Sequence, residues 1–338
     1  MEHVAIDLGG RESQVCVRSS DGTILEERRY ATRALRDYLE RRPKSRVIIE
    51  TCAESFSVAD AALALGHEVR VVAATLVRAL GVGARSTKTD QRDARLLSEA
   101  SCRMDLPSVH VPSLESRQRK AMCGMREALV TARTQLVNNV RGWLRTQTHR
   151  VRRCSTDTLT VRVREAFGEQ LPTYVERQLY MIDQLSAQIA KSDRELVVAA
   201  KQDATCRRLM SVPGVGPVTA LRFVAALDRV DRFESAHKVE AYLGLTPGEH
   251  SSSDRQQRLS ITKAGPPRMR WALVQSAWAA RRAKGSHAMV AWSFEVEKRR
   301  GKRIAIIALA RKIAGILYAL WRDGTFYAPD QGVGRPTA

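Results

Sequence analysis

The sequence predicts an α/β domain at its N-terminal end and a longer, mainly helical part behind it. Two patterns predict this fold class. Short apolar runs of β type alternate with helical patterns up to about residue 72, in the order β-β-β-α-β-α-β. From about Ser113 strand signals become few, and apolar residues recur at helical spacing. A domain boundary is therefore expected near residue 110.

The composition favours a nucleic-acid partner. The 338 residues are 44% hydrophobic, which is enough for the cores of two or three domains. Lys and Arg number 56 against 36 Asp and Glu, so the net charge is +20. Such an excess favours a polyanion, because each phosphate that Lys or Arg neutralises releases condensed counterions. A basic membrane-surface protein is the alternative, but neither a lipidation motif nor a long amphipathic terminal helix is visible.

A soluble intracellular protein is expected from three further features. The six cysteines are scattered, with no C-x-x-C pair, and are interpreted as reduced thiols rather than zinc ligands. The N-terminus lacks the basic, apolar and small-residue succession of a signal peptide. The most apolar helix, Ile304 to Trp321, carries Arg311-Lys312 in its middle and is predicted to be a core helix rather than a membrane span.

The first predicted strand, within residues 4–10, holds a carboxylate close to its end. Asp7 follows a run of apolar residues that indicates burial on both faces of a sheet. An ionised carboxylate there loses several kcal/mol of hydration unless a cation compensates it. A purely structural alternative is that Asp7 ends the strand and accepts hydrogen bonds from the turn at Gly9-Gly10.

The next elements complete the α/β pattern. Residues 14–17 and 24–30 flank the turn signal Ser20-Asp21-Gly22 and, with the first strand, predict a three-stranded meander. Helical stretches are expected at 35–41, closed by Pro43, and at 58–65, closed by Gly66. Each precedes a strand, at 46–50 and 67–72 respectively. The first of these strands again ends in an acid, Glu50.

Further acids open the helix that follows this sheet. Asp90 and Asp93 lie three residues apart in Lys88-Thr89-Asp90-Gln91-Arg92-Asp93-Ala94, so they share a helix face and can both point at the sheet. Their first-turn position also suits the helix dipole, which is a structural alternative. The element order and acid positions are those of ribonuclease H-like nucleotidyl transferases. A site of Asp7, Glu50, Asp90 and Asp93 would bind two Mg²⁺ ions about 4 Å apart for phosphodiester chemistry.

The middle of the chain shows two long helical stripes. The first stripe consists of Met122, Met125, Leu129, Leu136, Val140 and Leu144. The second consists of Val175, Ile182, Ile189 and Leu196, which recur every seven residues. An antiparallel helical pair or a dimerising coiled coil would bury both, and an ordinary bundle is the alternative. The basic stretch His149-Arg150-Val151-Arg152-Arg153 at the bend between helices could reach phosphate or simply be solvated.

Two motifs stand out in the last part of the sequence. Residues 209–220 predict helix, Gly-x-Gly hairpin, helix, in which Gly214 and Gly216 would let backbone N–H groups approach a phosphate. A plain helix connector is equally compatible. The serines Ser251-Ser252-Ser253 occupy a polar segment that is expected to be a loop. A serine hydroxyl near an activated phosphate could also attack phosphorus and hold a DNA end covalently.

Together these residues resemble the DEDD transposases of the insertion-sequence group one-ten, eleven-eleven subgroup. The resemblance covers roughly residues 4–321. Its anchors are Ala5-Ile6-Asp7, Ile49-Glu50, residues 88–94, Pro213-Gly214-Val215-Gly216, Gly244-Leu245-Thr246-Pro247, the serine triplet, and Ile261-Thr262-Lys263-Ala264-Gly265 with Arg270 following.

The resemblance implies an architecture and a set of roles. Residues 1–110 would form a domain like the RuvC resolvase, 111–203 a helical coiled-coil and dimerisation region, 204–326 a transposase domain, and 327–338 a tail. Asp7, Glu50, Asp90 and Asp93 would hold Mg²⁺, and Ser252 would be the nucleophile, although Ser251 and Ser253 stay open because Ser253 replaces the usual glycine. Lys263 and Arg270 would steady charge on the nucleic acid.

The resemblance also implies partners. Target and donor DNA, a structured noncoding bridge RNA that pairs with both, and a homo-oligomer from dimer to tetramer are expected in a prokaryotic cytoplasm. One subunit's acids would act with another's serine. Two alternatives stay open: a structure-specific endonuclease that uses water as nucleophile, and a non-catalytic nucleic-acid-binding protein.

Overall fold

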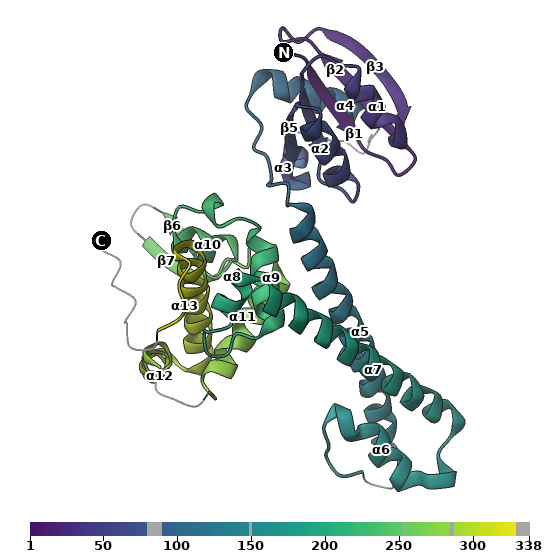
Figure 1. The fold of residues 1–338 in the computed structure, drawn as a ribbon, viewed down its shortest axis with the longest axis vertical. Helices are drawn as coiled ribbons and strands as arrows, with labels where there is room; N and C mark the ends of the chain where they lie inside the picture. Colours follow the sequence, from purple (N-terminus) through teal and green to yellow (C-terminus); the bar gives the residue numbers. More distant parts are fainter. Residues whose placement is uncertain (80–89, 149–150, 253–254, 284–286, 329–338) are drawn as a thin grey trace. The chain divides into compact units, whose positions relative to one another are not determined.

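The fold is described from a computed structural model (Figure 1), which divides the chain into two compact units, Met1–Pro112 and Ser113–Ala338. The structure describes residues 1–79, 90–148, 151–252, 255–283 and 287–328, and side chains within these ranges except at 78–79 and 250–258.

The first unit is built on a five-stranded mixed sheet. Its strands are β1 (His3–Asp7), β2 (Glu12–Arg18), β3 (Ile24–Ala31), β4 (Arg46–Glu50) and β5 (Glu68–Val72). They lie in the order β3-β2-β1-β4-β5, and β1, β2 and β3 pair antiparallel while β1, β4 and β5 pair parallel. The predicted meander and the β-β-β-α-β-α-β order are therefore confirmed.

Helices cover both faces of this sheet. They are α1 (Leu35–Glu40), α2 (Ser55–Ala64), α3 (Ala74–Ala79) and α4 (Asp90–Arg103), with a 3₁₀ turn at Thr32–Ala34. Successive side chains of a strand point to opposite faces. Thus Ile6 and Ile49 lie in the cluster with α1 and α2, whereas Ala5 and Ile48 lie in the cluster with Leu97 of α4.

Two long helices dominate the start of the second unit. They are α5 (Leu114–Leu144) and α7 (Thr173–Gln202), connected through α6 (Thr156–Phe167) and a 3₁₀ turn at Gly168–Gln170. Arg126 of α5 donates to Asp193 of α7 at 2.8 Å. Arg133, about two turns later in α5, donates to Ser186 of α7 at 3.2 Å. The contacts advance along α5 as they retreat along α7, so the pair is antiparallel, as Figure 1 also shows.

One of the two predicted stripes is confirmed and the other is partly wrong. Val175, Ile182, Ile189 and Leu196 are all buried along α7. On α5, however, Met122 and Met125 are exposed and Cys123 is buried instead. The first half of α5 packs on α9 as well as on α7. Because α9 lies beside it, the face of α5 that becomes buried is the one that carries Cys123 and not the one that carries the methionines.

The rest of the second unit is helical around one buried helix. Its elements are α8 (Ala204–Leu209), α9 (Pro217–Leu227), a 3₁₀ turn at Val230–Arg232, α10 (Ala236–Tyr242), β6 (Pro247–Ser252), β7 (Arg255–Ile261), α11 (Pro267–Ala280), α12 (Ala288–Arg300) and α13 (Lys302–Asp323). Among the described residues α13 is the helix long and apolar enough to cross a membrane, yet 56% of its apolar window is buried within the unit. The prediction of a core helix at 304–321 is confirmed.

Candidate active site

Two acids end adjacent parallel strands at the same level. Ile6 of β1 is in register with Ile49 of β4, so Asp7 and Glu50 are the next residues on each strand. Neighbouring strands lie about 4.8 Å apart. By the alternation described above, both acids share the face of Ala5 and Ile48, which is the face that α4 covers.

Helix α4 brings a third acid to the same place. Ser101 Oγ lies 2.8 Å from Nδ1 of His3 at the start of β1, and Ser98 Oγ lies 3.3 Å from Sγ of Cys16, which pairs with Ala5 in mid-strand. The helix therefore runs antiparallel to β1. A further four or five residues at about 1.5 Å each bring Asp93 to the level of Asp7. Asp93 is almost fully buried, with 1% of its surface exposed.

The fourth acid differs from the other three. Asp90 begins α4 with its side chain 65% exposed, and its Oδ2 lies 3.9 Å from Nη2 of Arg29 on β3. Asp90 and Asp93 were expected to point at the sheet together, but in the structure only Asp93 is buried there. Lys88 and Thr89, which open the same motif, fall outside the described residues.

The acids suit a divalent cation in chemistry and in backbone placement. No group of three or more His, Cys, Asp or Glu side chains within the described parts of the chain is close enough together to hold a metal ion. Even so, Asp7, Glu50 and Asp93 offer hard carboxylate oxygens, which Mg²⁺ prefers, at one end of one sheet face. Shared coordination requires these side chains to turn toward a common point.

An ion pair that the sequence analysis did not anticipate holds α4 on the sheet. Arg95 donates from Nε and Nη2 to the two carboxylate oxygens of Glu27 on β3, both at 2.5 Å, and Gln91 adds a bond at 2.9 Å. These hydrogen bonds, that of Arg95 first, lower the pKa of Glu27. The pair helps to fix the helix that carries Asp93.

This pair predicts an acid-sensitive attachment of α4. A carboxyl whose pKa is lower in the folded state adds stability above its unfolded pKa of about 4.3 and loses it as the pH falls further. We expect Glu27→Gln to speed hydrogen exchange of α4 amides about five-fold at pH 6, and we expect this difference from the unsubstituted chain to shrink as the pH falls toward 3. Peptide-resolved exchange of both chains at each pH measures this. An equal difference at the two pH values would contradict it.

The predicted serine loop is instead part of a β-hairpin. Ser251 pairs with Gln256 and Ser252 with Arg255 across β6 and β7, while Ser253 falls outside the described residues. The segment has no apolar alternation, and this is why its sequence does not predict strands. The two strands are instead brought together at the base of the hairpin, where the backbone segments before β6 and after β7 are in close contact.

That base is the crossing of two glycine-containing segments. Gly244 has φ +68°, and a Cβ placed on it would lie 2.0 Å from the carbonyl oxygen of Ala264. Gly265 has φ +79°, and its Cβ would lie 2.0 Å from the carbonyl oxygen of Tyr242. Only glycine allows both the conformation and the contact. Both glycines belong to the family motifs of the sequence, but the sequence pattern alone does not reveal that they cross.

Of the two basic residues predicted to bind nucleic acid in this unit, Arg270 has a visible structural role. Arg270 donates from Nη1 to the carbonyls of Leu243, Ala264 and Gly265 at 3.2, 2.8 and 3.0 Å, and so ties the crossing together. Lys263 is exposed with φ 57° in the same turn. A nucleic-acid contact by either residue stays a prediction.

The Gly-x-Gly hairpin between α8 and α9 also packs closely. Gly214 has φ +83°, and its Cβ would lie 2.2 Å from the carbonyl oxygen of Ser276 on α11. Gly216 immediately precedes α9 and has nothing within 4 Å of its Cβ position. Gly214 thus has a packing reason to be glycine, and contact of either glycine with a phosphate stays a prediction.

The chain is strongly basic, and its backbone places acids at the carboxyl ends of two adjacent parallel strands; this combination is typical of enzymes that act on nucleic acid. Comparison with known proteins narrows this class. A family model described as "Transposase" (DEDD_Tnp_IS110) matches residues 4–148, and one described as "Transposase IS116/IS110/IS902 family" matches residues 206–291.

Several curated proteins are similar to the chain. A "Probable family 20 transposase" of Pseudomonas aeruginosa is 30% identical over 97% of this chain and 99% of its own length. The transposase for insertion sequence element IS1328 of Yersinia enterocolitica is 28% identical over 96% and 98%. The transposase for IS1111A of Coxiella burnetii is 31% identical over 70% and 67%. The chain belongs to the IS110 family of DEDD transposases.

Proposed function

We propose that the chain cleaves and rejoins DNA with Mg²⁺ at Asp7, Glu50, Asp90 and Asp93 and with Ser252 as the nucleophile. The observation that carries the proposal is the placement of Asp7, Glu50 and Asp93 on one face at one edge of the sheet. The strand order β3-β2-β1-β4-β5 supports a ribonuclease H-like, RuvC-like domain at residues 1–110.

In this reaction the Ser252 hydroxyl attacks phosphorus. The Ser252 Oγ–P bond forms, a P–O bond of the DNA backbone breaks, the serine loses its proton and the departing DNA oxygen gains one. A DNA hydroxyl then reverses these changes on a new strand. Mg²⁺, when bound, supplies charge stabilisation at the phosphate. The crossing at Gly244 and Gly265 braces the hairpin that ends in the serines, which suits a nucleophile that must be presented rigidly.

The remaining parts of the proposal concern partners and assembly. A structured noncoding RNA would pair with target and donor DNA, which fits a chain that carries a net charge of +20. Within the second unit, residues 111–203 would form a dimerising coiled coil and 204–326 the transposase domain, ahead of the tail at 327–338. Assembly to a dimer or tetramer in a prokaryotic cytoplasm completes the proposal.

Mapping of the covalent intermediate tests the nucleophile. The purified chain is incubated with its RNA, target and donor DNA and Mg²⁺, denatured, and digested so that the peptide attached to DNA can be sequenced. We expect the adduct on Ser252, loss of the adduct in Ser252→Ala and its retention in Ser251→Ala. An adduct on Ser251 or Ser253 would show that this residue, and not Ser252, is the nucleophile. Cleavage by Ser252→Ala without any adduct would indicate water as the nucleophile.

A further inference from the structure

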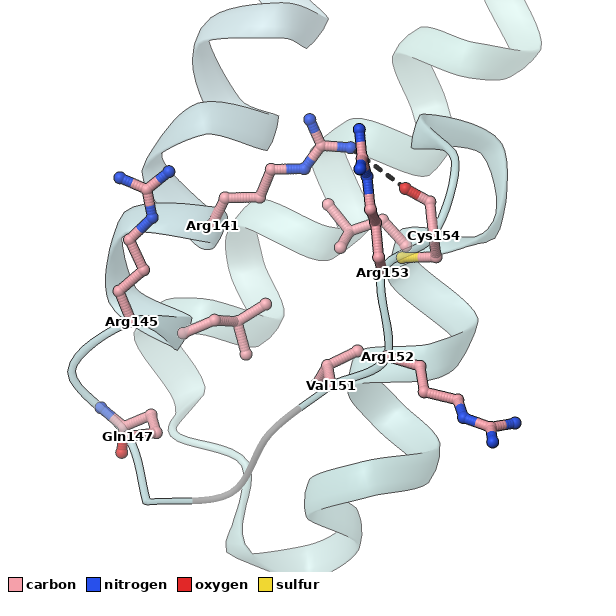
Figure 2. Close-up of a pocket in the computed structure, with 9 residues that line it drawn as sticks. Arg141, Arg145, Gln147, Val151, Arg152, Arg153 and Cys154 are labelled. Atoms are coloured by element: carbon pink, nitrogen blue, oxygen red, sulfur yellow. Dashed lines mark hydrogen bonds between the residues drawn. The ribbon is translucent and has the colours of Figure 1, made fainter.

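A basic pocket lies at the end of the helical pair that is joined through α6. It has a volume of about 720 Å³ and is lined by the end of α5 and by the segment that leads into α6 (Figure 2). Arg141, Arg145, Arg152 and Arg153 line it together with apolar side chains of Leu144, Val151 and Leu159. None of these residues belongs to the site described above.

The arginines at this pocket differ from four others in the same helical region. Arg119, Arg126, Arg133 and Arg164 each contact an Asp or Glu at 3.2 Å or less. Within the described part of the chain, no salt bridge involves the four pocket arginines. Sequence neighbours offer these arginines no acid, because no Asp or Glu occurs between Glu127 and Asp157; a partner would have to come from outside this stretch, as Asp157 does for Arg133.

Four guanidinium groups with no acidic partner among the described residues line this pocket, so an external anion is the natural counterpart. Arg141 and Arg153 lie near one another, whereas Arg145 and Arg152 extend away from each other (Figure 2). Arg145, Arg152 and Arg153 are exposed, and Arg141 already donates to the carbonyl oxygen of Cys154 at 3.3 Å. Guanidinium groups match phosphate oxygens with two parallel hydrogen bonds. A set of several arginines around one cavity therefore favours a ligand with more than one phosphate.

The apolar part of the pocket lining indicates what else the ligand contains besides phosphate. Leu144 and Val151 are half-buried and pack against the cluster that contains the buried Leu159, so part of the pocket lining is apolar. A base-paired duplex hides its bases and presents only phosphates and groove edges. A strand with an unpaired base offers both phosphates for the arginines and a ring face for the apolar side chains.

We propose that this pocket binds an unpaired nucleotide of a nucleic-acid strand, with its base against Leu144 and Val151 and its flanking phosphates on Arg145, Arg152 and Arg153. The site goes beyond the proposed reaction, because it needs neither the acids nor the serines. It would give the helical pair a nucleic-acid-holding role in addition to joining the parts of the chain.

Binding by paired variants tests the proposal. The full-length chain carrying Arg145→Ala, Arg152→Ala and Arg153→Ala is compared with a matched control carrying Arg162→Ala, Arg177→Ala and Arg194→Ala, which removes the same charge from exposed positions of α6 and α7. All chains also carry Asp7→Asn and are kept in EDTA, so catalysis plays no part. Fluorescence anisotropy measures dissociation constants for a 20-nucleotide single-stranded RNA, the corresponding DNA strand and its blunt duplex.

We expect the pocket variant to lose about ten-fold in affinity for a single strand and its salt dependence to fall by about 2 in log–log slope, as three lost phosphate contacts predict. The control variant should lose much less, and duplex binding should change equally in both variants. A preference between the RNA and DNA strands identifies the source of the nucleotide. Equal losses for the single strand in both variants would overturn the proposal, as would tighter binding of phosphatidylserine vesicles than of either strand.

A thiol footprint locates the bound strand independently. Cys154 lines the pocket, whereas Cys52 is exposed in the first unit. We expect a bound single strand to protect Cys154, but not Cys52, from alkylation in the chain with an intact pocket, as measured by peptide mass spectrometry. Unchanged alkylation of Cys154 at saturating strand would contradict occupancy of the pocket. Because the footprint needs no cleavage, its failure is distinguishable from failure of the proposed reaction.

Discussion

Replacing Asp7 by Asn is expected to lower the rate of DNA cleavage by at least about 10³-fold, equivalent to about 4 kcal/mol of transition-state stabilisation. Asn keeps the shape of the side chain and one oxygen but removes the negative charge. Asp7 stands beside Glu50 in the parallel register and at the level of buried Asp93, so we expect its charge to help to hold the Mg²⁺ proposed at these acids. Cleavage of labelled donor DNA with RNA and Mg²⁺ measures the loss.

Two comparison variants make this result specific. Asp37→Asn removes an exposed carboxylate from α1, which covers the opposite face of the sheet, and should cleave at the original rate. The cleavage rate of Asp90→Asn should lie between those of Asp7→Asn and Asp37→Asn, because Asp90 is exposed and close to Arg29. Circular dichroism confirms that each chain is folded. Cleavage by Asp7→Asn within a factor of a few of the unsubstituted chain would exclude this carboxylate from the active site.

Replacing Gly244 by Ala is expected to destabilise the second unit by about 3–5 kcal/mol. The added Cβ would lie 2.0 Å from the carbonyl oxygen and 2.7 Å from the nitrogen of Ala264, and φ +68° is unfavourable for any side chain. The neighbouring atoms are backbone and cannot rotate away. The crossing must therefore separate, and with it the base of the β6–β7 hairpin.

Urea unfolding followed by tryptophan fluorescence reads out the second unit alone, because all five tryptophans, at 143, 271, 278, 292 and 321, belong to it. Gly124→Ala provides a control of opposite sign. Gly124 lies inside α5 with nothing within 4 Å of its Cβ position, so alanine there should stabilise by roughly 0.5–1 kcal/mol. A midpoint for Gly244→Ala equal to that of the unsubstituted chain would show that the crossing tolerates a side chain.

Prediction from sequence succeeded where local pattern and burial coincide. The strands that end at Asp7 and Glu50 are apolar runs bounded by turn residues, and they form as predicted. It failed where partners far apart in the chain decide the structure. Met125 fits the helical stripe of α5 but is exposed because α9 packs beside a different face, and the serines form a strand because glycines on either side of them cross.

The sequence by itself determined the order of the elements, the positions of the acids at strand and helix ends, and the excess of positive charge. These follow from short-range periodicity and from composition, which need no knowledge of distant contacts. Only the tertiary structure decided that α4 runs antiparallel to β1, so that Asp93 is buried and Asp90 is not, and that four arginines without acidic partners surround one pocket. Helix direction, exposure and charge pairing depend on which elements pack together, and a one-dimensional pattern does not contain that information.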